Sequence, residues 1–207
     1  MQNLSIQFSP REEEINNFKE SFKNFGKIIK LNNGNQFSFQ KCPENIQNNK
    51  DYKISGENNN IVQKINGNGW VCILCDKELD KSIEEYIWRM KIINSFNNNP
   101  MFGVSKNDFN INSCSICKTD SHGWFYCGHD GYLYSGPPQH YYGKNIYLKK
   151  NSKEVKVIMN MKKGTLKFII DNEDKREAYT NIPLDKPLYP SVFLYYNNDS
   201  VEILPEK

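Results

Sequence analysis

The alternation of apolar and polar residues is clearest in the last third of the chain. Every second residue is Val or Met across 155–161, and the alternation restarts across 166–170 after a break at 162–165. Period-two alternation on both sides of a short turn containing glycine is typical of a β-hairpin with one buried face. Further strands are expected at 191–196, after a loop bounded by prolines, and at 201–204. This block therefore predicts an antiparallel sheet.

Shorter strand candidates fill the region before this hairpin. Clusters of Asn, Gly, Asp and Pro separate them at intervals typical of a sandwich or barrel. The candidates span 36–42, 52–55, 61–65, 70–75, 86–93, 101–105, 123–127 and 132–134. Large side chains at expected inward positions predict the core, and they are Trp88, Phe102, Trp124, Phe125, Leu166, Phe168 and Tyr189. The pattern predicts an all-β domain over residues 36–207.

Residues 1–35 carry a helical pattern instead. A serine N-cap, a proline and a glutamate across 9–12 mark a helix start. The next apolar residues recur at spacings of three and four and form one face, comprising Ile15, Phe18, Phe22 and Phe25. Exposing such a face would forgo roughly 1.5–3 kcal/mol per side chain. This amphipathic helix therefore packs on its own domain, or it docks on a partner or self-associates; the pattern leaves both open.

Composition narrows the class of protein. The chain has 207 residues and a net charge of +3, too small and too mixed in sign to indicate nucleic-acid binding by itself. No run approaches the ~20 apolar residues of a membrane span. The N-terminus lacks a signal pattern, so we expect a cytoplasmic, reducing location, with a cytoskeletal or ciliary assembly as an alternative setting. Asparagine runs at 58–60 and 97–99 are interpreted as loop residues from an AT-biased protist genome.

Two Cys-x-x-Cys pairs suggest a different function. Cys72/Cys75 and Cys114/Cys117 have the spacing that zinc ribbons use, which would indicate a zinc-binding, nucleic-acid-associated protein. The first pair lies in an apolar strand, where positions i and i+3 face opposite sides of the sheet. The second pair could form a turn, with His122 or Cys127 as further ligands. We expect reduced, partly buried thiols and no metal.

The sequence offers little for catalysis. His122, His129 and His140 could pair with Cys117 or Cys127 as a nucleophile, but no recognisable motif places a base and an orienting group beside a thiol. No glycine-rich phosphate loop precedes a helix. We therefore predict neither an enzyme nor a bound cofactor.

The segment 135–143 is the best candidate for a binding surface. Its prolines restrict the backbone, and stiff loops with tyrosines make good anchors for a protein partner. The candidate contact residues are Gln139, His140, Tyr141 and Tyr142. Whether one or both tyrosines fold back onto the sheet stays open.

Several motifs in order resemble the SPRY domain family. They are YKISGENNNIVQK (52–64), GWVCILCDKEL (69–79), WRMKII (88–93), MFGVSK (101–106), GWFYCGHDGYLYSG (123–136), KEVKVIMNMKKGTLKFIID (153–171) and LYPSVFLYYNNDSVEIL (188–204). The resemblance covers about residues 36–204. Asn160 stands where many members have Asp. No RING or B-box motif is recognised, so the resemblance gives no warrant for a ubiquitin ligase.

The resemblance implies a two-sheet antiparallel β-sandwich, a concanavalin-like jelly roll, that binds proteins through loops at one end and has no catalytic activity. It also places three further loops, 57–60, 77–81 and 119–122, on the rim with the 135–143 segment. These loops add Asn58, Asn59, Asp120 and His122 to the candidate contacts. We therefore expect a non-catalytic protein-interaction module, acting as an adaptor or as a subunit of a larger assembly.

Overall fold

The computed structural model describes residues 37–40, 50–106, 122–135, 140–141, 154–170, 173–174 and 176–205. The predicted N-terminal helix and its face lie outside these residues, so the division at 35/36 stays a prediction. Within the described residues, all the regular structure is β. No helix in that part of the chain is long and apolar enough to cross a membrane.

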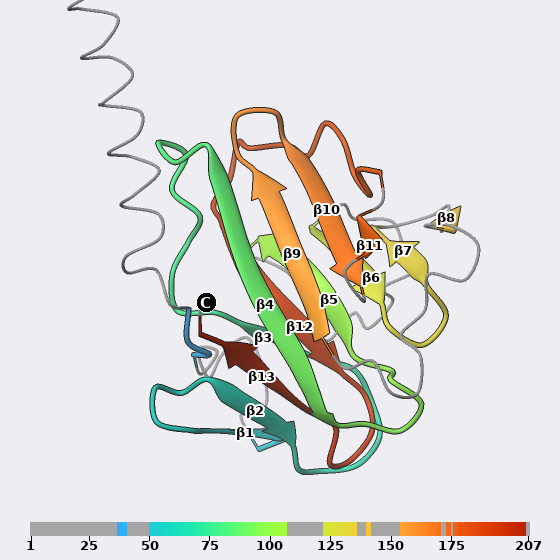
Figure 1. Ribbon diagram of the computed structural model, residues 1–207. Helices are drawn as coiled ribbons and strands as arrows, with labels where there is room; N and C mark the ends of the chain where they lie inside the picture. The colour runs from blue at the N-terminus through green and yellow to red at the C-terminus, as the bar shows by residue number, and fades with distance from the viewer. Residues whose placement is uncertain are drawn as a thin grey trace, which may run out of the picture. The chain divides into compact units, whose positions relative to one another are not determined.

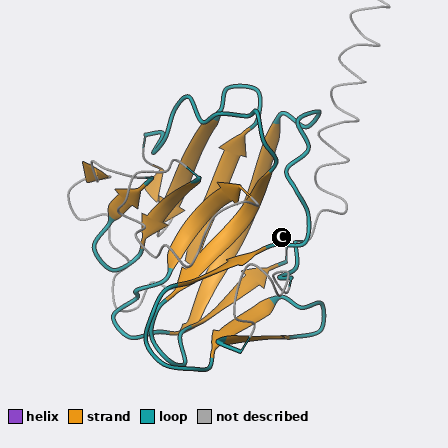
Figure 2. Cartoon of the chain, turned by 180° about the vertical axis from the view of Figure 1, so that it is seen from behind, coloured by secondary structure: helices purple, strands orange, loops and turns teal. Residues whose placement is uncertain are grey.

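In the described residues, thirteen strands form two antiparallel sheets, as the resemblance implied (Figure 1). The seven-stranded sheet contains, in order, β1 (Tyr52–Ser55), β2 (Ile61–Lys64), β13 (Ser200–Leu204), β4 (Glu85–Asn94), β9 (Glu154–Asn160), β10 (Thr165–Ile170) and β11 (Glu173–Asp174). The six-stranded sheet contains β3 (Val71–Leu74), β12 (Leu188–Leu194), β5 (Met101–Lys106), β6 (Gly123–Cys127), β7 (Tyr132–Tyr134) and β8 (His140–Tyr141). Figure 2 shows the same two layers from behind.

The β9–β10 hairpin has the predicted buried face. Leu166 pairs with Met159 and Phe168 pairs with Val157, and all four side chains are fully buried. The Asn160 side-chain oxygen accepts hydrogen bonds from the backbone N–H groups of residues 162 and 163, at 3.1 and 2.7 Å. This is the bond that an Asp at this position would accept. The departure from the family pattern therefore keeps the turn intact.

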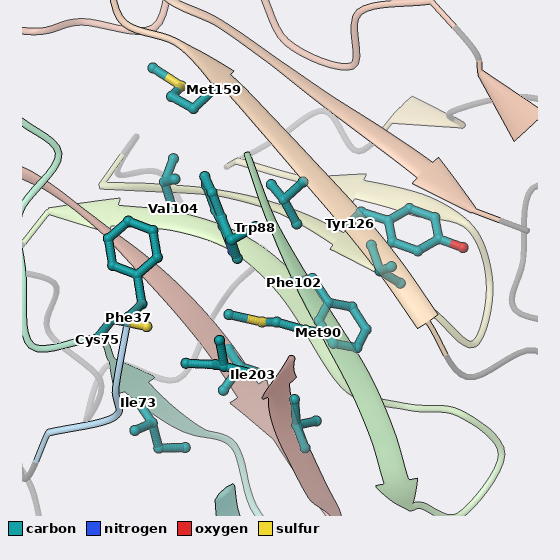
Figure 3. Close-up of a cluster of buried hydrophobic side chains, with 14 of the residues drawn as sticks. Phe37, Ile73, Cys75, Trp88, Met90, Phe102, Val104, Tyr126, Met159 and Ile203 are labelled. Atoms are coloured by element: carbon teal, nitrogen blue, oxygen red, sulfur yellow. The ribbon is translucent and has the colours of Figure 1, made fainter. Parts of the chain in front are cut away.

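Two hydrophobic clusters lie on opposite faces of the six-stranded sheet. The larger cluster fills the space between the sheets and includes Trp88, Phe102, Tyr126 and Met159 (Figure 3). The smaller one lies on the outer face, and its members are Cys72, Leu74, Met101, Phe125, Cys127 and Phe193, with Trp70, Tyr134 and Tyr189 packed against them.

The outer-face cluster corrects the prediction for two core residues. Phe125 is buried in that cluster and Tyr189 packs against it, so neither points into the interior. All five residues of β6 are buried. Burial on both faces removes the period-two signal that would distinguish inward from outward positions.

Strand β12 begins at Leu188, three residues before the predicted start, which was placed after Pro190. A proline lacks the N–H group that a central strand needs. The Pro190 carbonyl accepts a hydrogen bond from the Cys75 N–H at 2.8 Å, but Pro190 cannot donate one back to Cys75. The side chain of Gln40 donates to the Cys75 carbonyl instead, at 2.9 Å. The 37–40 segment therefore replaces the missing bond. Two-residue strands β8 and β11 were not predicted.

Candidate functional site

The loops of the sandwich gather at two ends. One, here called the Asp199 end, comprises loops 65–70, 95–100 and 195–199, which follow β2, β4 and β12. The other, the Lys106 end, comprises segments 75–84, 161–164 and 176–187 together with the last residue of β5. Backbone hydrogen bonds tie the second set together, from Met161 N–H to the Glu84 carbonyl and from Ile182 N–H to the Gly164 carbonyl.

The structure does not gather the described members of the predicted site into one patch. Asn58 and Asn59 are exposed in the β1–β2 turn, beside the edge strand of the seven-stranded sheet. His140 and Tyr141 form β8, the edge strand of the other sheet, which lies on the far side of the sandwich in Figures 1 and 2. His122 lies between these edges, just before β6. Gln139, Tyr142 and Asp120 lie outside the described residues.

The Asp199 end carries a group of aromatic side chains that the sequence reasoning missed. Phe96 is 61% exposed, and its ring centroid lies 5.0 Å from that of Tyr196. Tyr196 contacts Tyr195 at 4.8 Å, and Tyr195 contacts Trp70 at 4.9 Å, all in edge-to-face geometry. Such edge-to-face pairs are favourable beyond the area that they bury. We call Phe96, Tyr195, Tyr196 and Trp70 the aromatic surface.

A buried carboxylate holds the loops that carry this surface. Asp199 is 1% exposed. Its two oxygens accept hydrogen bonds from the backbone N–H groups of Phe96 at 3.2 Å, Tyr195 at 3.2 Å and Tyr196 at 2.8 Å. Charge-assisted bonds of this kind are stronger than those between neutral groups. One side chain therefore fixes two loops from different parts of the chain.

The third loop, 65–70, is held through the Gly69 N–H, which donates to the Tyr195 carbonyl at 3.0 Å. Lys64, the last residue of β2 before this loop, is 3% exposed. Its backbone N–H donates to the Asp199 carbonyl at 2.9 Å, and its own carbonyl accepts from the Asn198 N–H at 2.9 Å. Burial lowers the pKa of the Lys64 ammonium, while Asp51 and Asp199 act in the opposite direction. The Lys64–Asp199 contacts therefore join β2 to the β12–β13 loop.

The asparagines of these loops have a structural role. Asn97, Asn98 and Asn198 adopt positive φ values of 56°, 54° and 70°, a conformation that asparagine tolerates better than most residues. The Asn94 side chain also donates to the Asn198 carbonyl at 3.1 Å. The interpretation as loop residues is correct for these positions, but the asparagines also shape the turns.

The three loops of the Asp199 end are rich in polar and aromatic residues and poor in charged ones. They contain Asn, Gly, Ser, Tyr, Trp and Phe, and Asp199 is their one acidic or basic residue. Antibody loops that recognise proteins are enriched in the same residue types, because Tyr and Trp give large contact areas at low entropic cost. The aromatic residues stand in three short segments that are far apart in the sequence, and only the fold brings these segments together.

The thiols of the described residues are unsuited to metal binding as a pair. Cys72 lies in the outer-face cluster and Cys75 in the interior cluster, so the sheet separates them as the spacing predicted. Burial raises the pKa of the Cys75 thiol well above its usual range. No group of three or more His, Cys, Asp or Glu side chains in the described part of the chain is arranged to hold a metal ion. Cys114 and Cys117 lie outside it.

The described residues give no support to a Cys–His nucleophile, which the sequence also disfavoured. Burial, with Asp130 nearby, raises the pKa of Cys127 to about 12, which keeps the thiol protonated and unreactive at neutral pH. The Nδ1 atom of His129 lies 3.0 Å from the Asn97 carbonyl oxygen, so this ring nitrogen is engaged with a loop backbone. These residues hold the Asp199 end together rather than forming a reactive pair.

Two antiparallel sheets with loops gathered at both ends define a β-sandwich domain, and comparisons with known proteins identify the family. The SPRY domain family model matches residues 85–207. The chain belongs to the SPRY domain family, as the sequence motifs indicated. SPRY domains are generally non-catalytic protein-interaction modules.

Solved SPRY structures share the fold. The SPRY domain of human HERC1 matches with a TM-score of 0.61 and 21% identity, over 82% of this chain and 99% of that one. The TRIM65 PSpry domain matches with a TM-score of 0.61 and 12% identity, over 86% and 97%. A human SPRY domain matches with a TM-score of 0.58 and 12% identity, over 76% and 97%. A search of curated proteins found no match.

Proposed function

We propose that this protein is a non-catalytic interaction module that binds a protein partner through the Asp199 end. The observation that carries the proposal is the aromatic surface, in which Phe96 is exposed and the other three rings are half-buried, on loops fixed by a buried carboxylate. Side chains that are already ordered lose little conformational entropy on binding. Aromatic residues of this kind supply most of the energy in many interfaces. The role is that of an adaptor or of a subunit of a larger assembly.

The loop that contains Gln139, His140, Tyr141 and Tyr142 remains the second candidate for the partner contact. Its backbone joins the sheet through β8, where His140 pairs with Leu133 and Tyr141 with Tyr132. The β8 edge and the aromatic surface belong to different parts of the fold, so substitutions can test them separately. A cytoplasmic location is part of the same proposal, supported by the free thiols of Cys75 and Cys127.

The test compares two pairs of substitutions against one partner. A pull-down from the source organism with the full chain identifies the partner, and calorimetry then measures its affinity. Phe96→Ala with Tyr196→Ala should weaken binding by about thirtyfold or more, as expected for hot-spot residues. The backbone N–H groups that bind Asp199 remain in this variant, so the fold should persist.

Two controls make the result specific. Ile87→Ala removes an apolar side chain of 39% exposure from the seven-stranded sheet, and this should leave the affinity unchanged. Tyr141→Ala with Tyr142→Ala tests the second candidate. If that pair abolishes binding while the Phe96 and Tyr196 variant binds normally, the Asp199 end is not the contact surface. A stoichiometric, salt-resistant complex would indicate a subunit, whereas a free monomer with micromolar affinity would indicate an adaptor.

A further inference from the structure

Lys106, at the opposite end of the sandwich, is a buried charge with few partners among the described residues. It is the last residue of β5 and follows Phe102 and Val104 at the inward-facing positions of that strand. The whole residue is 8% exposed. Burying an ammonium group is costly unless paired charges and hydrogen bonds replace the lost water. The position of Lys106 therefore calls for good acceptors.

The structure supplies only one acidic partner to Lys106 among the described residues. The Nζ atom lies 3.6 Å from an Asp185 carboxylate oxygen, and the two side chains are 10% and 64% exposed. This separation exceeds the usual range of a charge-assisted hydrogen bond. The surface pair of Arg89 and Glu154, by comparison, lies at 3.0 Å. An ammonium has three donors, so Lys106 retains capacity for a closer acceptor.

The surroundings of Lys106 favour a negatively charged group. The Nζ atom lies 5.8 Å from the centroid of the Trp124 ring, close enough for a cation–π contact. The ring and the strand keep the ammonium in place while Asp185 stands largely in solvent. Although desolvation acts in the opposite direction, the nearby ammonium lowers the pKa of the Asp185 carboxyl. The charge of Lys106 therefore acts on a carboxylate that lies outside the core.

Lys64 is the other buried lysine among the described residues, and it differs from Lys106 in the number of nearby carboxylates. Two carboxylates, Asp51 and Asp199, act on its ammonium, and Asp199 is itself buried. Among the described residues, Lys106 has one carboxylate within ion-pair distance, on the largely exposed side chain of Asp185. A carboxylate from another molecule can therefore take the place of Asp185.

We propose that Lys106 is a binding site for the carboxylate of an acidic residue on a partner protein, and that Asp185 occupies this site in the unbound chain. This inference concerns the Lys106 end and does not depend on the aromatic surface. The site adjoins His122, whose backbone carbonyl accepts a hydrogen bond from the Lys106 N–H at 2.8 Å. The resemblance placed His122 among the partner contacts, and a lysine beside it would favour an acidic partner residue.

Three short peptides test the proposal with the full chain. The peptide acetyl-Gly-Glu-Gly-amide carries one side-chain carboxylate, acetyl-Gly-Gln-Gly-amide carries none, and acetyl-Gly-Gln-Gly with a free C-terminus carries only a terminal carboxylate. Nuclear magnetic resonance follows the amide signals of Lys106 and His122 and the indole signal of Trp124. We expect saturable shifts with the Glu peptide and none with the neutral peptide. Equal shifts with both would overturn the proposal, and preference for the free C-terminus would overturn the assignment to a side chain.

Substitutions separate binding from a structural role. Asp185→Asn removes the internal competitor, so it should tighten Glu-peptide binding by about two- to fivefold, the range expected for losing an exposed ion pair. Lys106→Met keeps an apolar stem of similar length and should abolish the shifts, with circular dichroism confirming the fold. Glu57→Gln makes the same charge change in the exposed β1–β2 turn and should leave affinity unchanged. Weaker binding by Asp185→Asn would contradict the displacement of Asp185.

Discussion

The substitution Asp199→Asn tests whether one carboxylate holds the Asp199 end together. One oxygen accepts the Phe96 N–H, and the other accepts the N–H groups of Tyr195 and Tyr196. An asparagine can keep one oxygen, but its NH₂ group faces backbone donors at the other position. At least one charge-assisted bond is lost, and the buried Lys64 ammonium loses a countercharge.

The expected loss is about 3 kcal/mol of unfolding free energy, because a hydrogen bond to a charged group contributes about 1.5–3 kcal/mol and the stranded donors add to it. Urea denaturation followed by tryptophan fluorescence measures this loss. With a slope near 2 kcal/mol per molar urea, the midpoint should fall by about 1.5 M at an unchanged slope.

The control for this experiment is Asp185→Asn, which removes an exposed carboxylate and should cost no more than about 1 kcal/mol. A loss below about 1 kcal/mol for Asp199→Asn would refute the reasoning. It would mean that the backbone of loops 95–100 and 195–199 keeps its position without the charge, and that the aromatic surface is not fixed by Asp199.

Three further predictions concern the sheets. Gly103→Ala should prevent stable folding, because the new Cβ would lie 1.9 Å from the Trp124 carbonyl oxygen. Its control is Gly67→Ala, which places the Cβ in open space at φ +55° and should cost only about 1 kcal/mol. Equal losses of stability in circular dichroism melts of the two variants would show that the chain relieves the Gly103 clash. Tyr179→Phe should lower the unfolding free energy by about 1–2 kcal/mol, because the hydroxyl donates to a β6 carbonyl at 2.8 Å; an unchanged urea midpoint would show that water replaces this bond. Cys127 has its pKa raised to about 12, so the unfolded thiol ionises first as pH rises. The contribution of this thiol to stability is present below about pH 8.5 and is lost towards pH 12, at about 1.4 kcal/mol per pH unit. The unfolding free energy of the wild type should therefore fall relative to that of Cys127→Ala over that window. A constant difference between the two proteins would argue against the raised pKa.

The strands were predictable where only one face is buried. The β9–β10 hairpin alternates strictly, so its buried face and turn followed from the residue pattern. Strand β6 is buried on both faces, and the sequence therefore misplaced Phe125. Pro190 moved the expected start of β12, because the compensating bond comes from Gln40, a residue distant in sequence. Local patterns contain no information about such partners.

The candidate site was less predictable than the fold. The sequence reasoning favoured the stiff loop at 135–143 because proline and tyrosine are adjacent there. The aromatic surface instead combines Trp70, Phe96 and Tyr195 from three loops, and each loop by itself resembles an ordinary polar turn. Lys106 was equally hidden, since nothing in the local sequence says that a lysine at a strand end points inward.

Residues 37–40 contact both sheets, and this determines the smallest part of the chain that can fold by itself. Phe39 donates its N–H to the Asn59 carbonyl and forms a bridge with Cys75, and both Phe37 and Phe39 are buried. A fragment limited to the family match at 85–207 would lack this segment and β1–β3. It would leave β12 and β13 as unprotected edges, which promote aggregation. The autonomous folding unit therefore begins no later than Phe37, almost fifty residues before the family motif.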